Sequence, residues 1–303
     1  MGSLTAAPVS GDPSPSDAND ATTPAPRRSR RRRPRPTPGT YLRRLIVIGY
    51  LFLLVIWPVA LVVQKTFDGG LDNLQTALQD AVVTDALQLT VIVALWAVAI
   101  NTVFGVGISL LLVRYEFWGR NVLSALIDLP LSVSPIVVGL SLLLAYGGTN
   151  GTFGPALESA GLQIAFATPG IVLATAFVSL PLVIREIVPV LHEIGTEQEQ
   201  AATSLGAGPL QTFRRITLPS IKWALVYGVV LSLARALGEF GAVKVVSGNI
   251  AQQTQTATLV VEEKYQDFEQ GSAYATSFLL ALIAVAALVV VTILRPKDDT
   301  DGD

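Results

Sequence analysis

The sequence predicts an all-α membrane protein with six transmembrane helices. Hydrophobic residues make up 51% of the 303 residues and charged residues only 15%, and the mean hydropathy is +0.54. This composition excludes an ordinary soluble domain. A helix needs roughly 20 apolar residues to cross a hydrocarbon core of about 30 Å, and six segments meet that requirement. We place the predicted spans near residues 45–63, 87–113, 122–146, 169–190, 221–247 and 274–294.

The third predicted span, 122–146, contains Asp128, Pro130 and Pro135. A proline inside a helix removes a backbone hydrogen bond and clashes with the preceding turn. Backbone groups freed at membrane depth must be covered by protein or water. We therefore expect this span to be kinked or broken where other helices cover it. Asp128, and Asn101 in the second span, are expected to form hydrogen bonds between helices.

Basic residues orient the chain. If the amino terminus lies in the cytoplasm, the outer loops hold only Lys65 and Lys264 among the lysines and arginines. The cytoplasmic side then carries an arginine cluster near the amino terminus, together with Arg114, Arg214 and Arg215. Cytoplasmic segments of membrane proteins are enriched in Lys and Arg. We therefore predict a multi-pass protein of the cell membrane with both termini in the cytoplasm.

The chain divides into three predicted regions. Residues 1–40 are rich in proline, serine and alanine and carry the arginine cluster, so we expect a disordered, basic cytoplasmic tail. Residues 41–295 form the six-helix transmembrane domain with a cytoplasmic loop at 192–220, and residues 296–303 form an acidic cytoplasmic tail. The arginines either bind headgroups of membrane lipid or hold the first helix in place. The first apolar stretch has the length of a full span, which predicts an uncleaved helix.

The loop between the fourth and fifth spans has a helix, turn, helix pattern. Thr196 and Glu199 are spaced as a capping box. Gly206 suits a left-handed helix stop, and Pro209 suits the first turn of a second short helix. Helices shorter than about 12 to 15 residues are marginal alone in water, so both need a partner surface. Apolar anchors for that surface are expected at Leu205, Leu210 and Phe213.

The same loop carries a spaced motif. It reads Gln200-Ala201-Ala202, three residues, Gly206, nine residues, and then Ile216-Thr217-Leu218-Pro219. This spacing is similar to that of the cytoplasmic coupling loop of importer-type ABC permeases, although Gln200 stands where the family pattern has glutamate. A plain surface hairpin between two spans is the alternative. The predicted ATPase-coupling residues are Glu199, Gln200, Ala201, Ala202, Gly206, Pro209, Ile216, Leu218 and Pro219.

A second stretch extends the resemblance and points to a substrate class. With the segment from Ala234 through Gly238-Glu239-Phe240-Gly241 to Val243, the chain resembles sulfate/thiosulfate permease subunits of ABC transporters over roughly residues 45–294. The related molybdate/tungstate permeases share the Gly-Glu-Phe-Gly core. The resemblance implies an importer-type ABC permease fold and ATP-driven uptake of a tetrahedral oxyanion, with sulfate or thiosulfate ahead of molybdate or tungstate. A secondary anion transporter is the competing class, but it does not need the coupling loop.

The resemblance also implies partner subunits. The sequence has no Gly-x-x-x-x-Gly-Lys-Ser/Thr motif, so ATP and Mg²⁺ are expected to act in two separate ABC ATPase subunits. The outer loops are shorter than the ~50 residues of a small domain, which assigns substrate capture to an external solute-binding protein. A second permease subunit, either a paralogue or another copy, is expected to complete the pathway. We expect no nucleic-acid partner.

The residue inventory argues against an enzyme. There is no cysteine and the only histidine, His192, falls in the cytoplasmic loop. The chain therefore has few side chains that could form a catalytic pair of nucleophile and base. We predict no catalytic residue, no metal site and no cofactor bound by this chain.

Charged residues in the fifth predicted span form the candidate anion pathway. Arg235 and Glu239 are four residues apart, and Lys244 and Ser247 follow. A charge at membrane depth costs at least ~2.5 to 3.5 kcal/mol, so it must be paired or face water. Arg235 and Glu239 either form a structural ion pair or, with Lys244, shape the potential of an anion route. A row of small residues in the same span predicts close helix packing, at Ala224, Gly228, Ser232 and Ala236.

Overall fold

The computed structural model describes residues 38–148 and 151–293, and within these ranges every regular element is helical. The all-α prediction is therefore confirmed for this part of the chain. Residues 1–37 of the predicted basic tail and the whole predicted acidic tail at 296–303 lie outside the described residues.

Among the residues that the structure describes, five helical stretches are long and apolar enough to cross a membrane. The first, Arg43–Phe67, combines most of α1 (Pro38–Leu51), a π-helical turn (Phe52–Ile56) and α2 (Trp57–Phe67). The second, third and fifth are α4 (Ala81–Arg114), α8 (Thr168–Ile194) and most of α14 (Gln270–Ile293). The fourth, Pro209–Leu237, combines α10 (Pro209–Thr212), a π-helical turn (Phe213–Thr217) and α11 (Leu218–Leu237). Shorter helices are α3 (Asp72–Gln79), α7 (Gly154–Ser159), α9 (Glu197–Ser204), α12 (Gly241–Val246) and α13 (Ala257–Gln266).

The chain separates into two compact units at Leu53. In the first unit, α1 exposes large apolar side chains such as Leu45 and Ile48. The second unit begins at Leu54 and contains the helices from α2 to α14.

The remaining predicted span is broken, as the prolines predict. Helix α5 (Arg120–Ser132) and helix α6 (Pro135–Tyr146) meet at an angle of 115°. Pro135 occupies the first turn of α6. A Cβ atom added to Gly139 on α6 would lie 2.6 Å from the backbone oxygen of Ala242, so α12 packs directly against the bent segment. Protein therefore covers the face of α6 that carries Gly139, whereas Leu131, Ser132 and Ser134 at the break itself are exposed. The described residues reach six candidate spans when the bent pair is counted as one.

The predicted fifth span, 221–247, is too long. Helix α11 ends at Leu237, and Gly241–Val246 forms the separate helix α12. The Glu239 carboxylate accepts a hydrogen bond from the Ala242 backbone N–H (3.0 Å) at the amino-terminal end of α12, where a negative charge is favourable. Lys244 and Ser247 therefore do not continue the helix that carries Arg235.

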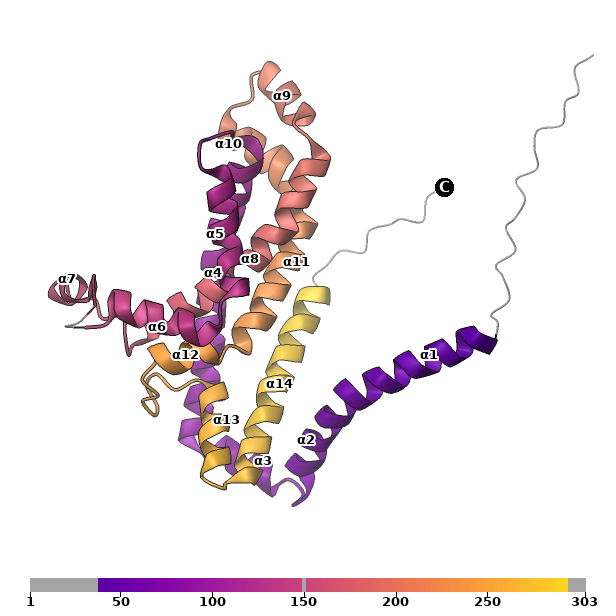
Figure 1. Ribbon diagram of the computed structural model, residues 1–303, viewed down its shortest axis with the longest axis vertical. Helices are drawn as coiled ribbons and strands as arrows, with labels where there is room; N and C mark the ends of the chain where they lie inside the picture. Colours follow the sequence, from indigo (N-terminus) through magenta and orange to yellow (C-terminus); the bar gives the residue numbers. More distant parts are fainter. Residues whose placement is uncertain (1–37, 149–150, 294–303) are drawn as a thin grey trace, which may run out of the picture. The chain divides into compact units, whose positions relative to one another are not determined.

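The core lies where α4, α8 and α11 run side by side (Figure 1). A Cβ atom added to Gly228 would lie 2.8 Å from the Val183 Cα, which confirms the predicted close approach. The Asn101 amide on α4 donates hydrogen bonds to Ser179 Oγ on α8 (2.8 Å) and to Ser232 Oγ on α11 (3.3 Å). The interhelical role predicted for Asn101 is confirmed, and this contact fixes the relative height of the three helices.

The two ends of the bundle differ. Helices α9 and α10 lie at one end, and α3 and α13 lie at the other (Figure 1). At the α13 end, Lys264 Nζ contacts Glu269 (2.7 Å) and Asp80 (3.0 Å). The hydrogen bond to Glu269, aided by Asp80, raises the pKa of Lys264 against the opposing effect of burial. Burial would raise the pKa of Asp80, but hydrogen bonds from Lys264 and from the Val82 backbone lower it overall. This cluster holds α13 against the starts of α4 and α14.

Candidate functional site

The loop between α8 and α11 folds back on itself at two glycines. Gly195 follows α8 with φ of 70°, and Gly206 follows α9 with φ of 88°. The Ala207 backbone N–H donates to Ala202 O (3.0 Å) and closes the end of α9. The left-handed stop at Gly206 and the helix start at Pro209 are both confirmed. A Cβ atom at Gly206 would meet nothing within 4 Å, so glycine is favoured there by backbone conformation alone.

The predicted capping box is wrong. Thr196 has φ of −118° and ψ of −2°, outside the extended conformation of a capping residue, and its side chain makes no cap hydrogen bond. Thr196 Oγ1 instead accepts a hydrogen bond from Gln200 Nε2 (3.0 Å). The Glu199 carboxylate is engaged elsewhere.

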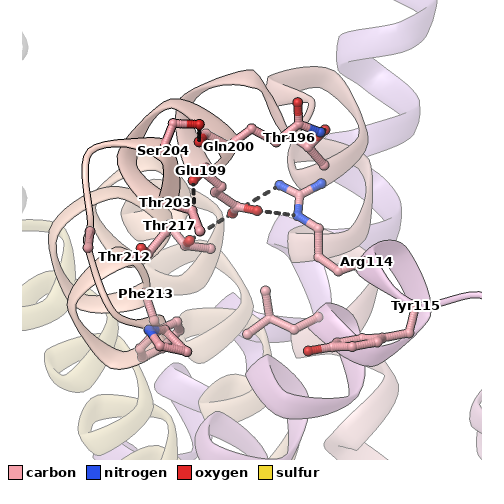
Figure 2. Close-up of a pocket in the computed structure, with 13 residues that line it drawn as sticks. Arg114, Tyr115, Thr196, Glu199, Gln200, Thr203, Ser204, Thr212, Phe213 and Thr217 are labelled. Atoms are coloured by element: carbon pink, nitrogen blue, oxygen red, sulfur yellow. Dashed lines mark hydrogen bonds and ion pairs between the residues drawn. The ribbon is translucent and has the colours of Figure 1, made fainter.

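Glu199 joins α9 directly to two other segments and, through Arg114, to a third (Figure 2). Its carboxylate forms an ion pair with Arg114 at the end of α4, with Nε to Oε2 at 3.0 Å and Nη2 to Oε1 at 3.3 Å. Thr217 Oγ1 in the π-helical turn donates to the same carboxylate (2.7 Å). Arg114 Nη1 also donates to Leu191 O near the end of α8 (3.1 Å). We call this set, made of Arg114, Leu191, Glu199 and Thr217, the Glu199 anchor.

The Glu199 anchor is stronger than a surface ion pair. Only 12% of the Arg114 side chain and 21% of the Glu199 side chain are exposed. Exposed pairs contribute about 0 to 1 kcal/mol, whereas an arginine–carboxylate ion pair shielded from water and joined by a charge-assisted hydrogen bond from Nη2 is stronger. The eight residues of α9 are too few for a helix that is stable alone, so this contact is what holds α9 in place. From the sequence, Arg114 served only to predict the orientation of the chain in the membrane, and its ion pair with Glu199 was not predicted.

A cavity of 680 Å³ lies on the inner side of the loop. Figure 2 shows Arg114 and Tyr115 on one side of it and Phe213 on the other. Hydroxyl groups dominate the polar part of the wall. The lining residues are Leu110, Arg114, Tyr115, Thr196, Glu199, Gln200, Thr203, Ser204, Ala207, Pro209, Thr212, Phe213 and Thr217.

The outer side of the loop is partly apolar. Leu205 and Leu210 are 89% and 77% exposed, as expected for anchors that await a partner. Phe213 does not join them, because it packs inward against the buried cluster that contains Leu191 and Ile221. The second short helix is also not separate, since α10 runs through the π-helical turn into α11. Among the other motif residues, Gln200, Ala201 and Pro219 are exposed and Ala202, Ile216 and Leu218 are half-buried.

The structure brings only part of the candidate anion pathway together. Arg235 Nη2 lies 2.9 Å from Glu239 Oε2, with the arginine side chain 38% exposed and the carboxylate buried. Thr258 Oγ1 donates to Glu239 O (3.0 Å), so this residue also fastens α13. Lys244 pairs with Glu262 instead. Ser247 is fully buried, and its Oγ accepts a hydrogen bond from the Asn249 backbone N–H (3.1 Å). The predicted Arg235–Glu239 ion pair is therefore present, while a pathway role for these residues stays a prediction.

Metal-binding groups are scarce in the residues that the structure describes. No group of three or more His, Asp or Glu side chains is placed to hold a metal ion in this part of the chain. His192 is exposed near the end of α8.

Comparison with known families identifies the type of protein. A family model described as "Binding-protein-dependent transport system inner membrane component" matches residues 101–297. The chain belongs to this family. It is thus a multi-pass membrane component of a transport system, and family membership confirms the prediction that it is not an enzyme.

Individual relatives agree with the family assignment. The chain is 47% identical to "Sulfate transport system permease protein CysW" of Synechococcus elongatus, over 82% of this chain and 86% of that protein. It is 44% identical to the CysW protein of Escherichia coli, over 80% of this chain and 83% of that protein. A chain from a bacterial alginate ABC transporter, solved in complex with an alginate-bound periplasmic protein, has a TM-score of 0.72 at 16% identity and covers 87% of this chain and 96% of its own length. The predicted permease fold is confirmed.

The Glu199 anchor makes a prediction about local stability. In a Glu199→Ala variant, α9 loses its ion pair and its bond to Thr217, so its backbone amides should exchange with deuterium roughly tenfold faster, because about 1.4 kcal/mol of local stability corresponds to a factor of ten. Gln200→Ala is the matched control, since Gln200 is exposed and bonds only to Thr196 among the contacts described above. Hydrogen exchange of residues 198–204 that is unchanged by Glu199→Ala would contradict the anchor.

Proposed function

We propose that this chain is one permease subunit of an ATP-driven importer of sulfate. The observation that carries the proposal is the 44–47% identity, over about four fifths of the chain, to proteins named sulfate transport system permeases. Sulfate and thiosulfate are tetrahedral oxyanions with two negative charges. A free energy penalty of tens of kcal/mol opposes entry of such an ion into hydrocarbon, so its route must be wet.

The loop from Thr196 to Pro219 is proposed to couple transport to ATP hydrolysis. It protrudes at one end of the bundle and presents Leu205 and Leu210 without cover (Figure 1). Two exposed apolar side chains, one at the end of the short helix α9 and one on α10, fit a groove on a partner protein. The Glu199 anchor then passes displacement of α9 to α4, α8 and α11 through Arg114, Leu191 and Thr217.

Three kinds of partner complete the proposed transporter. Two ABC ATPase subunits bind ATP and Mg²⁺ and dock on the loop. An external solute-binding protein delivers the anion, which agrees with the family description and with the periplasmic protein bound to the alginate transporter. A second permease subunit, a paralogue or another copy, supplies the other half of the route.

Both termini are proposed to lie in the cytoplasm. The support is the unequal number of basic residues at the two ends of the bundle. Arg114, Arg214 and Arg215 all lie at the end that carries α9. Lys65 and Lys264 lie at the opposite end, near α3 and α13.

Substrate identity is tested by uptake. With its partner subunits and binding protein in vesicles, the complex should take up labelled sulfate when ATP is supplied on the ATPase side. Excess unlabelled thiosulfate should compete strongly and molybdate weakly. Molybdate uptake that is unaffected by excess sulfate would reverse the choice of substrate, and uptake without ATP would favour a secondary transporter.

Topology is tested with single cysteines, because the chain has none of its own. Thr203 and Ser159 are both exposed and lie in loops on opposite sides of the proposed membrane. A thiol at Ser159 should react with an impermeant reagent added outside intact cells, and a thiol at Thr203 should react only after permeabilisation. The reverse pattern would invert the chain and remove the ATPase docking site.

Coupling is tested at Gly206. Valine at φ of 88° is strained by about 1 to 3 kcal/mol, so Gly206→Val should distort the loop and lower substrate-stimulated ATP hydrolysis and uptake about tenfold while the complex still assembles. Gly208→Val is the matched control: Gly208 has φ of −73° and ψ of 162°, open space around a Cβ, and a following proline that favours this conformation. Equal activity of the two variants would show that the loop is only a connector.

A further inference from the structure

A second ion pair joins two helices at membrane depth. Asp128 on α5 and Arg185 on α8 are in contact through Oδ1 and Nε at 3.0 Å. The contact confirms the interhelical bonding predicted for Asp128, whereas Arg185 was not singled out from the sequence. Unlike the buried Glu239 carboxylate, both partners are open: 47% of the Asp128 side chain and 57% of the Arg185 side chain are exposed.

Both helices place this pair at the same distance from the proposed cytoplasmic side. Asp128 lies eight residues from Arg120, where α5 begins, and Arg185 lies nine residues from Ile194, where α8 ends. At ~1.5 Å per residue these separations are about 12 and 13 Å, and both helix ends belong to the proposed cytoplasmic side. The two independent counts agree. With the two helix ends taken as the cytoplasmic edge of the membrane, they put the pair within a hydrocarbon core of about 30 Å.

An exposed ion pair at this depth is unfavourable against lipid. Insertion scales put the cost of a single charge at about 2.5 to 3.5 kcal/mol or more, pairing removes only part of it while both side chains stay half open, and aspartate is too short to reach the headgroups. We infer that the open face of the pair meets water or the polar surface of another subunit. Glu186, next to Arg185, is half-buried at the same level, so polar character extends beyond the pair.

We propose that Arg185 is an anion-binding position of the translocation route and that Asp128 holds its guanidinium in place. Asp128 engages Nε, and the exposed side chain leaves the forked Nη end free to bind two oxygens of a tetrahedral oxyanion. The carboxylates of Asp128 and of the neighbouring Glu186 also weaken the attraction, which lets the anion leave again. This inference rests on the proposed import of an oxyanion and names a binding position for it.

The position lies at a different depth from Arg235. Gly228 on α11 contacts Val183 on α8, and the two helices run in opposite directions. Arg235, seven residues beyond Gly228, is therefore level with residue 176 of α8. Arg185 lies nine residues nearer the cytoplasmic end, or about 13 Å at ~1.5 Å per residue. An anion that leaves the level of Arg235 thus meets a second guanidinium, also paired with a carboxylate, farther along.

The test uses a thiol beside the pair in the assembled transporter. Ser132 is exposed one helical turn beyond Asp128 on the same face of α5, toward the membrane centre, and Ser132→Cys is nearly isosteric. The thiol introduced at position 132 should react with a negatively charged methanethiosulfonate reagent, and the reaction is measured both with and without ATP. Millimolar sulfate, compared with chloride at equal ionic strength, should slow the reaction. Val103→Cys on α4 is the control, because Val103 is 71% exposed at a comparable depth but apolar, and it should stay unlabelled.

Arg185 variants in the Ser132→Cys background decide the role of the guanidinium. Arg185→Gln should weaken sulfate protection about tenfold, as for loss of a charge-assisted hydrogen-bonding group, and Arg185→Lys should keep part of it. The double variant Arg185→Gln with Asp128→Asn preserves a neutral hydrogen-bonded pair. Recovery of both assembly and sulfate protection in that variant would overturn the proposal and leave a packing role only.

Two further outcomes separate this inference from the proposed function. If the unmodified complex imports sulfate but Ser132→Cys is inert in every state, another subunit covers the pair and the anion position is refuted while sulfate import stands. If molybdate rather than sulfate is imported and protects the thiol through Arg185, the binding position stands and the substrate assignment fails.

Discussion

The high free energy of an unpaired charge or polar group in hydrocarbon governs this structure. Polar side chains at the proposed membrane depth have partners on other helices: Asn101 has two serines, Asp128 has Arg185, and Glu239, besides its ion pair with Arg235, contacts Ala242 of α12 and Thr258 of α13. Because such contacts are directional, they set the relative heights of helices that dispersion forces alone would allow to slide. Small residues then bring the backbones close enough for these contacts, as at Gly228.

The same constraint explains why the cytoplasmic loop is not independent of the bundle. A helix of eight residues acquires a fixed position only by bonding to something rigid. Glu199 supplies that bond, and its partners Arg114 and Thr217 belong to the ends of α4 and α11. The loop therefore presents Leu205 and Leu210 from a base that is bonded to the membrane helices, as the proposed coupling requires.

Local patterns in the sequence predicted the features that depend on neighbouring residues. The lengths of the apolar runs predicted the membrane spans, and the prolines predicted the break between α5 and α6. Gly206 and Pro209 predicted the turn in the loop. Contacts between distant segments were beyond the sequence alone. Thr196 and Glu199 fit a capping box, but the carboxylate gains more from Arg114, 85 residues away. Similarly, the apolar run through residue 247 looked continuous, because only the packing of Gly241 against Pro135 and the Glu239 contact to Ala242 make α12 separate.

The π-helical turn Phe213–Thr217 joins α10 to α11 without a break, so Pro209–Leu237 is a single rod of 29 residues. Gly206 lies just before one end of this rod, and Arg235 lies in its last turn at the other. If a docked partner tilted the loop end of this rod, the contacts at Gly228 and Ser232 would act as the pivot, and the end that carries Arg235 would move the opposite way. Arg235 is bonded to Glu239, which in turn fastens α12 and α13, so the same movement would pull on both of these helices. The continuity of this one helix therefore links the position of the loop to the position of Arg235.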